Sequence, residues 1–109
     1  MVMQRPLSTQ SLLVLSVLRQ RKQSFGSEIM SETGLASGTI YPLLRRFETW
    51  GWVVSNWEDQ TPSELGRPRR RHYELTVRGI DQSASEVARL KVILDATSPR
   101  TRRLGLAPQ

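Results

Sequence analysis

The segment from Ser37 to Gly51 constrains the fold of this chain more than any other part of the sequence. Its apolar residues recur at intervals of three and four, at Ile40, Leu43, Leu44 and Phe47. This is the period of a helix that buries one side. At about 100° per residue, the opposite side carries Gly38, Pro42, Arg45 and Thr49, with Tyr41 and Arg46 on the flanks. The pattern therefore predicts a helix whose buried stripe backs onto a cationic and aromatic outer face.

The ends of this helix follow from residues with known terminal preferences. Ser37 or Thr39 is expected to cap the N-terminus through a side-chain oxygen. A start just after Thr39 would place Pro42 in the first turn, where no backbone N–H is needed. A start at Ser37 would instead remove the hydrogen bond to the Gly38 carbonyl. Gly51 fits the position that ends the helix. An ordinary surface helix with two solvated arginines would show the same pattern, so the neighbouring segments decide its role.

Two further helices are predicted upstream. Ser8 or Thr9 can cap the first, which begins near Ser11 and ends in a basic segment. It is apolar on more than one side, so we expect two partners to bury it. The second spans Ser24 to Thr33 and ends at Gly34, a few residues before the third helix. A helix, a short glycine-containing turn and a second helix are the layout of a helix-turn-helix, although many helical hairpins share it.

After Gly51 the apolar period changes to about two, which is the period of a strand. The sequence predicts a hairpin with strands over Trp52 to Glu58 and Arg70 to Leu75, joined by a loop over Asp59 to Arg69. The far end of the loop concentrates arginines at Arg67, Arg69, Arg70 and Arg71. Such a run can be a solvated loop. Directly after a helix-turn-helix, it can instead straddle a phosphate backbone, or reach into the adjacent minor groove, while the preceding helix lies in a major groove.

A last helix is predicted from Val77 to Asp95, with Thr76 as its cap. Its apolar stripe is narrow and consists of Ile80, Ala84, Val87, Leu90 and Leu94. Such a helix packs either on its own domain or, as we expect here, on a copy of itself. Together the segments predict a mainly α fold with a small β-hairpin. We expect residues 1–9 to be an N-terminal arm, 10–76 a winged helix-turn-helix domain, 77–95 a dimerisation helix and 96–109 a basic disordered tail.

Composition restricts the function classes. The chain has 109 residues, a net charge of +6 and 16 cationic residues, of which all but Lys22 and Lys91 are arginine. This favours a polyanionic partner, because the planar guanidinium suits phosphates and base edges. There is no cysteine, and the single histidine, His72, has no metal-ligand or catalytic partner at the required spacing. We expect no enzyme activity, metal or cofactor. Since neither a signal-peptide nor a membrane-spanning pattern is present, we expect a cytoplasmic protein.

Two blocks of the sequence, GTIYPLLRRFETWGWV (38–53) and GRPRRRHYELTVRG (66–79), resemble the winged helix-turn-helix of the PadR family of bacterial transcriptional regulators. The first block is similar to the family's third helix at Tyr41, Pro42, Leu43, Leu44, Arg46, Phe47 and Glu48. The second is similar to its wing at Gly66, Arg67, Pro68, Tyr73, Leu75, Thr76 and Gly79. The resemblance covers residues 10 to 95 or so. It implies a homodimer built through the last helix with help from the first, which binds palindromic operator DNA, usually as a repressor.

The resemblance also implies roles for individual residues. Those expected at double-stranded DNA are Ser37, Gly38, Thr39, Tyr41, Pro42, Arg45 and Arg46 in the helix and Arg67, Arg69 and Arg70 in the wing. Those expected at the dimer interface are Leu12, Leu15, Ile80, Ala84, Val87, Leu90 and Leu94. The helical geometry supports a base-facing position for Gly38, Pro42 and Arg45. The flanking positions Thr39, Tyr41 and Arg46 are better placed for phosphates. Glu48 is expected to pair with a neighbouring arginine.

The sequence departs from the family pattern in its large aromatic residues. Phe47 and Trp52 are larger than the leucines common at their positions. The last helix has no aromatic residue, whereas in some relatives an aromatic of that helix lines a ligand pocket at the dimer interface. The sequence therefore identifies no small-molecule effector. Trp50, Trp52 and Trp57 are expected to pack in the core or the wing rather than to cage a ligand.

Three other functions fit parts of the pattern. They are a winged helix that binds another protein, a winged-helix regulator of another family such as a MarR-like one, and a DNA-binding protein without sequence preference. The distribution of charge separates the first from a DNA binder. If DNA is the partner, Arg45, Arg46 and the run from Arg67 to Arg71 are expected to form one contiguous positive surface. The dependence of binding on salt and on sequence separates the others.

Overall fold

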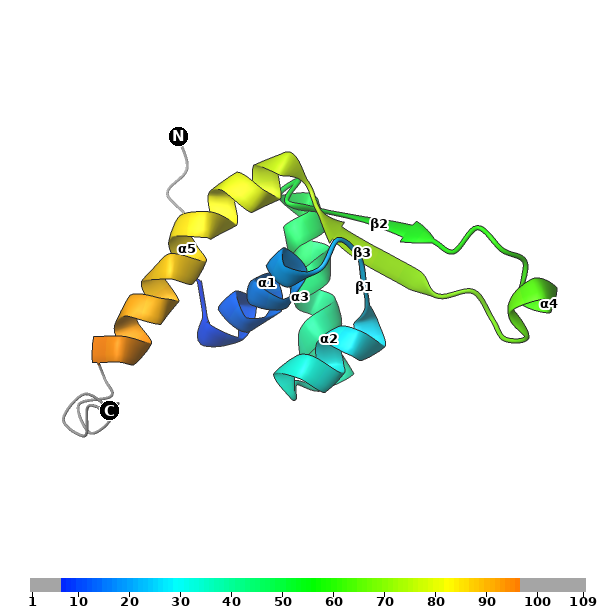
Figure 1. Ribbon diagram of the computed structural model, residues 1–109, viewed down its shortest axis with the longest axis horizontal. Coiled ribbons are helices and arrows are strands. Elements are labelled where there is room, and N and C mark those ends of the chain that lie inside the picture. The colour runs from blue at the N-terminus through cyan, green and yellow to red at the C-terminus, as the bar shows by residue number, and fades with distance from the viewer. Residues whose placement is uncertain (1–6, 97–109) are drawn as a thin grey trace, which may run out of the picture.

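The computed structural model describes residues 7–96 and consists of five helices and three short strands within that range (Figure 1). The elements are α1 (Thr9–Gln20), β1 (Ser24–Phe25), α2 (Gly26–Thr33), α3 (Ser37–Thr49), β2 (Val53–Trp57), α4 (Pro62–Leu65), β3 (Arg71–Leu75) and α5 (Val77–Ala96). The mainly α fold with a small sheet is thereby confirmed. Most of the expected N-terminal arm and nearly all of the expected basic tail lie outside the described residues.

The core lies where α1, α2 and α3 meet the sheet. The apolar stripe of α3 is buried as predicted, with Ile40 and Phe47 fully covered, and Ile29 of α2 packs into the same cluster. Helix α1 contacts α2, α3 and α5, which confirms that more than one partner buries it. Each large apolar side chain removed from water in this way contributes about 1.5–3 kcal/mol to stability. The core therefore fixes which side of α3 remains outside.

Two residues expected at a dimer interface belong to the core of the single chain. Leu12 and Leu15 in α1 are 2% and 0% exposed. Side chains covered to this extent offer no surface to a second copy of the chain. The prediction that Leu12 and Leu15 lie at a dimer interface is therefore wrong for the fold of the single chain. Leu13, on the outer side of the same helix, is 36% exposed.

The sheet has three antiparallel strands in the order β1-β3-β2. The two long strands form the predicted hairpin, with Val53 opposite Leu75 and Trp57 opposite Arg71. The start of the second predicted helix was wrong. Ser24 and Phe25 form β1 opposite Tyr73 and His72, and the helix begins only at Gly26. These two residues are extended because they pair with a strand almost fifty residues away in the sequence. Local helix propensity contains no information about such a long-range pairing.

Helix α3 starts at Ser37, and its N-cap is Ala36. The expected side-chain cap from Ser37 or Thr39 is therefore wrong, since no side chain caps this end. The backbone N–H groups of Thr39 and Ile40 donate to the Ala36 carbonyl instead. Pro42 consequently lies inside the helix, where it removes the bond to the Gly38 carbonyl. Because this loss falls near the N-terminus, the helix continues to Thr49.

The wing loop is more ordered than the sequence suggested. The expected irregular loop contains α4, a single helical turn. Thr61 and Glu64 form a capping box around its start, with Glu64 accepting from the Thr61 N–H at 2.8 Å. Gly66 ends the turn with a left-handed backbone (φ 71°). In Figure 1 the wing projects to the right of the domain with α4 at its tip.

Helix α5 lies on the side of the molecule opposite the wing (Figure 1). Thr76 caps its start as predicted, because its Oγ1 accepts from the Gly79 N–H at 2.9 Å. Arg19 of α1 holds the first turns by donating to the Ile80 carbonyl at 2.7 Å and to Ser83 Oγ at 3.0 Å. Within residues 7–96, no helix is long and apolar enough to span a membrane.

Candidate nucleic-acid interface

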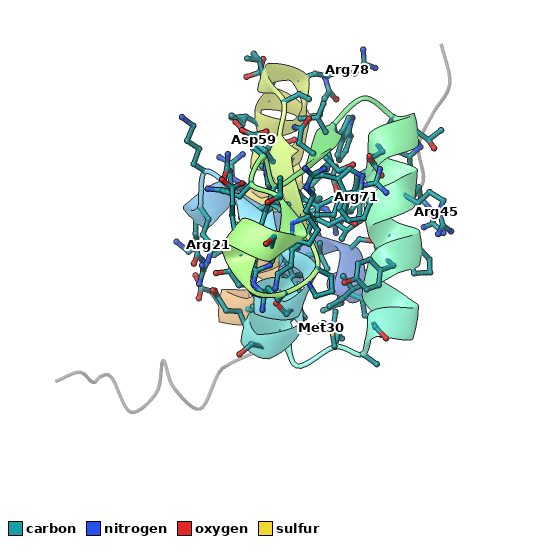
Figure 2. All side chains as sticks on the ribbon, turned by 90° about the vertical axis from the view of Figure 1, so that its right-hand side faces the viewer. Arg21, Met30, Arg45, Asp59, Arg71 and Arg78 are labelled. Carbon is teal, nitrogen blue, oxygen red and sulfur yellow. The ribbon has the colours of Figure 1, made fainter. Side chains whose placement is uncertain are left out.

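The outer face of α3 is exposed over its whole length. Gly38, Pro42, Arg45 and Arg46 are all exposed, as is Ser37 at the start of the helix. Figure 2 shows Arg45 pointing away from the body of the protein, on the side of the molecule opposite Arg21. This exposure follows from the buried stripe, because a helix that buries Ile40 and Phe47 must present Pro42 and Arg45 on its other side. A helix with such a face can lie in a major groove.

Two polar residues on the flanks of α3 are less exposed. Thr39 is half-buried, and Tyr41 is 39% exposed. The Tyr41 ring lies 6.5 Å from the Tyr73 ring of β3, and its hydroxyl reaches Gly26 at the start of α2, where a Cβ atom would overlap it. Tyr41 therefore connects α3 to the sheet and to α2.

One wing arginine is paired within the protein. Both terminal nitrogens of Arg67 donate to the Glu58 carboxylate, at 2.7 and 3.0 Å. This hydrogen-bonded pair lowers the pKa of Glu58 from 4.5 to about 2, and it raises the pKa of Arg67. Glu58 also accepts from the Arg70 backbone N–H at 2.9 Å. Arg67, which the family resemblance implied at the DNA, thus braces the wing, and sequence reasoning missed Glu58, the acid that holds it.

The other wing arginines are exposed. Arg69 donates from Nε to the Gln60 carbonyl at 2.8 Å, which leaves its charge without a countercharge. The Arg70 guanidinium lies 5.6 Å from the centre of the Phe25 ring. No carboxylate lies within ion-pair distance of Arg69 or Arg70 in the described part of the chain. These two arginines therefore remain available to an anionic partner.

Arg71 completes the cationic surface towards α3. Its Nε donates to Ser55 Oγ at 2.9 Å, and a terminal nitrogen lies 3.9 Å from Glu48 of α3. Glu48 itself accepts from Ser55 Oγ at 2.7 Å. The expectation that Glu48 is an intramolecular partner is confirmed. Arg71 therefore connects β3 to Glu48 of α3.

The three tryptophans divide between core and surface. Trp52 is 2% exposed and its ring stacks on Phe47 at 6.0 Å, with Trp50 packed beside both. Trp57 is 56% exposed and lies under the Arg71 guanidinium. Trp50 and Trp52 pack in the core, as expected, whereas Trp57 lies on the surface of the wing. His72 is half-buried, and no group of residues between positions 7 and 96 could hold a metal ion.

A second surface runs along α5. Of its predicted stripe, Ile80 is 46% exposed, Ala84 is exposed, and Val87 and Leu90 are half-buried, while Leu94 is 54% exposed. Helix α5 packs on α1 through part of this stripe. The rest of the stripe leaves apolar surface on the side of the molecule away from the wing.

Comparison with known proteins identifies this arrangement. The family model of the transcriptional regulator PadR-like family matches residues 14–85. A PadR family transcription regulator from Clostridium difficile R20291 has a similar solved structure, with a TM-score of 0.68 and 24% identity over 84% of this chain and 97% of that chain. One from Eggerthella lenta DSM 2243 has a TM-score of 0.62 and 26% identity over 83% and 81%.

A third similar structure is that of BpsR from Bordetella bronchiseptica, whose DNA binding is regulated by 6-hydroxynicotinic acid. It has a TM-score of 0.71 and 16% identity over 94% of this chain and 66% of that chain. Comparison with curated proteins gave no match. The family match covers well over half of the sequence and includes the helix-turn-helix, the wing and the first turns of α5. This chain belongs to the PadR-like family of transcriptional regulators.

Proposed function

We propose that this protein is a homodimeric repressor that binds a palindromic operator. In this proposal each copy places α3 in a major groove, with Gly38, Pro42 and Arg45 towards the bases and Ser37, Thr39, Tyr41 and Arg46 towards the backbone. The wing contacts flanking phosphates through Arg69 and Arg70. Repression follows because the bound dimer covers the promoter.

The observation that carries this proposal is the exposed outer face of α3 beside uncompensated wing arginines. Arg45, Arg46, Arg69 and Arg70 are exposed, and no ion pair between described residues involves them. Uncompensated guanidiniums on one side of a protein favour a polyanion, and an adjacent bare helix face supplies a means to read sequence. If the protein instead bound another protein, its arginines would be expected to be ion-paired or scattered over the surface.

The proposed dimer uses α5. The exposed part of its stripe, at Ile80 and Ala84, can pack against the same stripe of a second copy, which gives a two-fold symmetric pair. Two-fold symmetry in the protein requires a palindrome in the DNA. The half-sites are then expected to lie about one helical turn apart, roughly 10 bp from centre to centre.

The test is fluorescence anisotropy with a labelled duplex from the region upstream of the gene, against a scrambled duplex, over a salt series. A specific operator binder is expected to prefer the upstream duplex by about 10³-fold or more near physiological salt. Footprinting of that duplex should then show two half-sites. Equal affinity for both duplexes with a steep salt dependence would make the protein a non-specific DNA binder. Absence of binding at low salt would favour a protein partner.

A further inference from the structure

A cleft of about 390 Å³ lies between the start of α2, the N-terminal half of α3 and the region of the wing where β2 ends and β3 begins. Its walls include Phe25, Gly26, Tyr41, Trp57, Arg70 and Arg71. Figure 2 views the wing end-on, with α3 beside the wing strands. The cleft thus lies between the two elements that the proposed function brings to DNA.

Two guanidiniums are held in the walls by aromatic rings. Arg70 lies over Phe25 and Arg71 over Trp57, each with 5.6 Å between the guanidinium carbon and the ring centre. A planar guanidinium on a ring face keeps its orientation. Among the described residues no carboxylate pairs with Arg70, whereas Arg71 already donates to Ser55 Oγ and lies 3.9 Å from Glu48. The covered ring faces are no longer available to stack a flat ligand. The walls therefore suit an oxyanion better than an aromatic molecule.

Two cationic side chains, Arg70 and Arg71, line the cleft, and both are exposed. Burial raises the pKa of the Tyr73 phenol in the same wall, and the nearby Arg71 opposes this effect. Glu48, 3.9 Å from Arg71, is the one carboxylate with a described ion-pair contact to either wall arginine in residues 7–96.

We propose that this cleft seats one backbone phosphate of the DNA, from the strand that runs between the major groove occupied by α3 and the minor groove next to the wing. The proposal rests on the proposed function. It adds Arg71, Phe25 and Trp57 to the contact surface: Arg70 and Arg71 bind the phosphate oxygens, and the two rings orient them.

The first test compares Arg70→Ala, Arg70→Lys and Phe25→Leu with the wild type, on the upstream duplex and on the scrambled one. A phosphate contact carries no sequence information, so Arg70→Ala is expected to weaken both complexes alike and to reduce the salt slope by about one for each bound copy of the protein. Arg70→Lys keeps the charge and Phe25→Leu keeps the arginine. Both are expected to weaken binding with the salt slope unchanged, because only the orientation of the cation is lost. Lys22→Ala, which removes one cation at a different cavity, is the control.

The second test places a single neutral methylphosphonate at successive positions of the upstream duplex. One position in each half-site is expected to weaken wild-type binding but to have no further effect on Arg70→Ala, which identifies the phosphate in the cleft. If every position weakens both proteins equally, or if Arg70→Ala keeps the wild-type salt slope, the cleft holds no phosphate. Equal wild-type affinity for the two duplexes would overturn the operator proposal alone, since the cleft test needs only that DNA binds.

Discussion

The arginines of this protein have different roles, and the residues around each arginine determine its role. Arg45 projects from α3 and has no carboxylate within ion-pair distance among residues 7–96, whereas Arg67 is fully paired with Glu58. Sequence reasoning could assign the outer face of α3, because the period of the buried stripe fixes the opposite side. It could not separate Arg67 from Arg69, because both stand in one run and the acid that distinguishes them lies nine residues earlier, across the hairpin.

Arg45 is expected to read a base. If it contacts a guanine, Arg45→Ala should lose about 1–3 kcal/mol of binding free energy and relax the preference at one operator position. The measurement is the affinity of the variant for a set of operator duplexes with single base changes. Arg69→Ala serves as the contrast, since loss of a phosphate contact should weaken all duplexes alike. Wild-type affinity of Arg45→Ala for every duplex would remove the base-reading role from this face.

Gly79 is expected to be irreplaceable for packing. A Cβ atom there would overlap the Trp52 carbonyl and lie 3.0 Å from Leu75 Cδ2. Gly79→Ala should therefore destabilise the fold by roughly 1–3 kcal/mol through forced backbone movement, which outweighs the gain of about 1 kcal/mol in helix propensity. The measurement is urea unfolding. Gly38→Ala is the matched control, because open space surrounds Gly38 in α3, and its stability should be unchanged or slightly higher.

Among the elements, the wing shows best what local sequence predicts and what it does not. The two strands of the hairpin follow from their period of about two, and the turn from its prolines and glycine. Strand β1 could not be found, because two residues carry no period and their pairing with β3 depends on the whole fold. Helix α4 had a readable signal in Thr61 and Glu64, which stand at the spacing of a capping box.

The order of the wing loop is expected to depend on the Glu58–Arg67 pair. Because the pair lowers the pKa of Glu58 to about 2, it stabilises the loop above the ordinary carboxyl pKa of 4.5. This stabilisation is lost as the pH falls through about 2. Arg67→Ala should raise the Glu58 pKa towards 4.5 and speed hydrogen exchange at the Arg70 amide, which donates to Glu58. NMR titration of the carboxyl and amide exchange rates measure both.

A double variant, Glu58→Gln with Arg67→Gln, tests whether Arg67 only braces the wing loop or also contacts DNA directly. Replacing Glu58 and Arg67 together by glutamine leaves the net charge unchanged. If Arg67 only braces the loop, the double variant should bind DNA more weakly than wild type with the same salt slope. A slope reduced by about one for each bound copy, as expected for Arg69→Ala, would instead place Arg67 on a phosphate.

At the scale of the whole molecule, the wing and α5 lie at opposite ends with α3 between them (Figure 1). A dimer joined through α5 would leave both α3 faces and both wings free, so one arrangement serves assembly and DNA binding together. The stripe of α5 was readable from its spacing. The sequence could not predict which part of this stripe packs on α1 and which part stays exposed, because the contact between α1 and α5 depends on the tertiary fold.

Leu90, half-buried in the single chain, is expected to complete its burial in the dimer. A charge there would have to be desolvated at the interface, so Leu90→Glu should give monomers. Ser85→Glu, on an exposed position away from the stripe, adds the same charge and should leave the dimer intact. Size-exclusion chromatography with light scattering measures the mass, and circular dichroism shows whether each variant is folded.

The same variant is expected to reveal how much of the affinity comes from linking two half-sites. Binding of the second half-site within a dimer is intramolecular, so a folded monomer should lose roughly 10²–10⁴-fold in operator affinity while its affinity for a single half-site stays unchanged. A folded Leu90→Glu protein that remains dimeric would show that the interface lies elsewhere on the molecule. A folded monomer that keeps wild-type operator affinity would show that each copy binds DNA independently, and the requirement for a palindrome would then disappear.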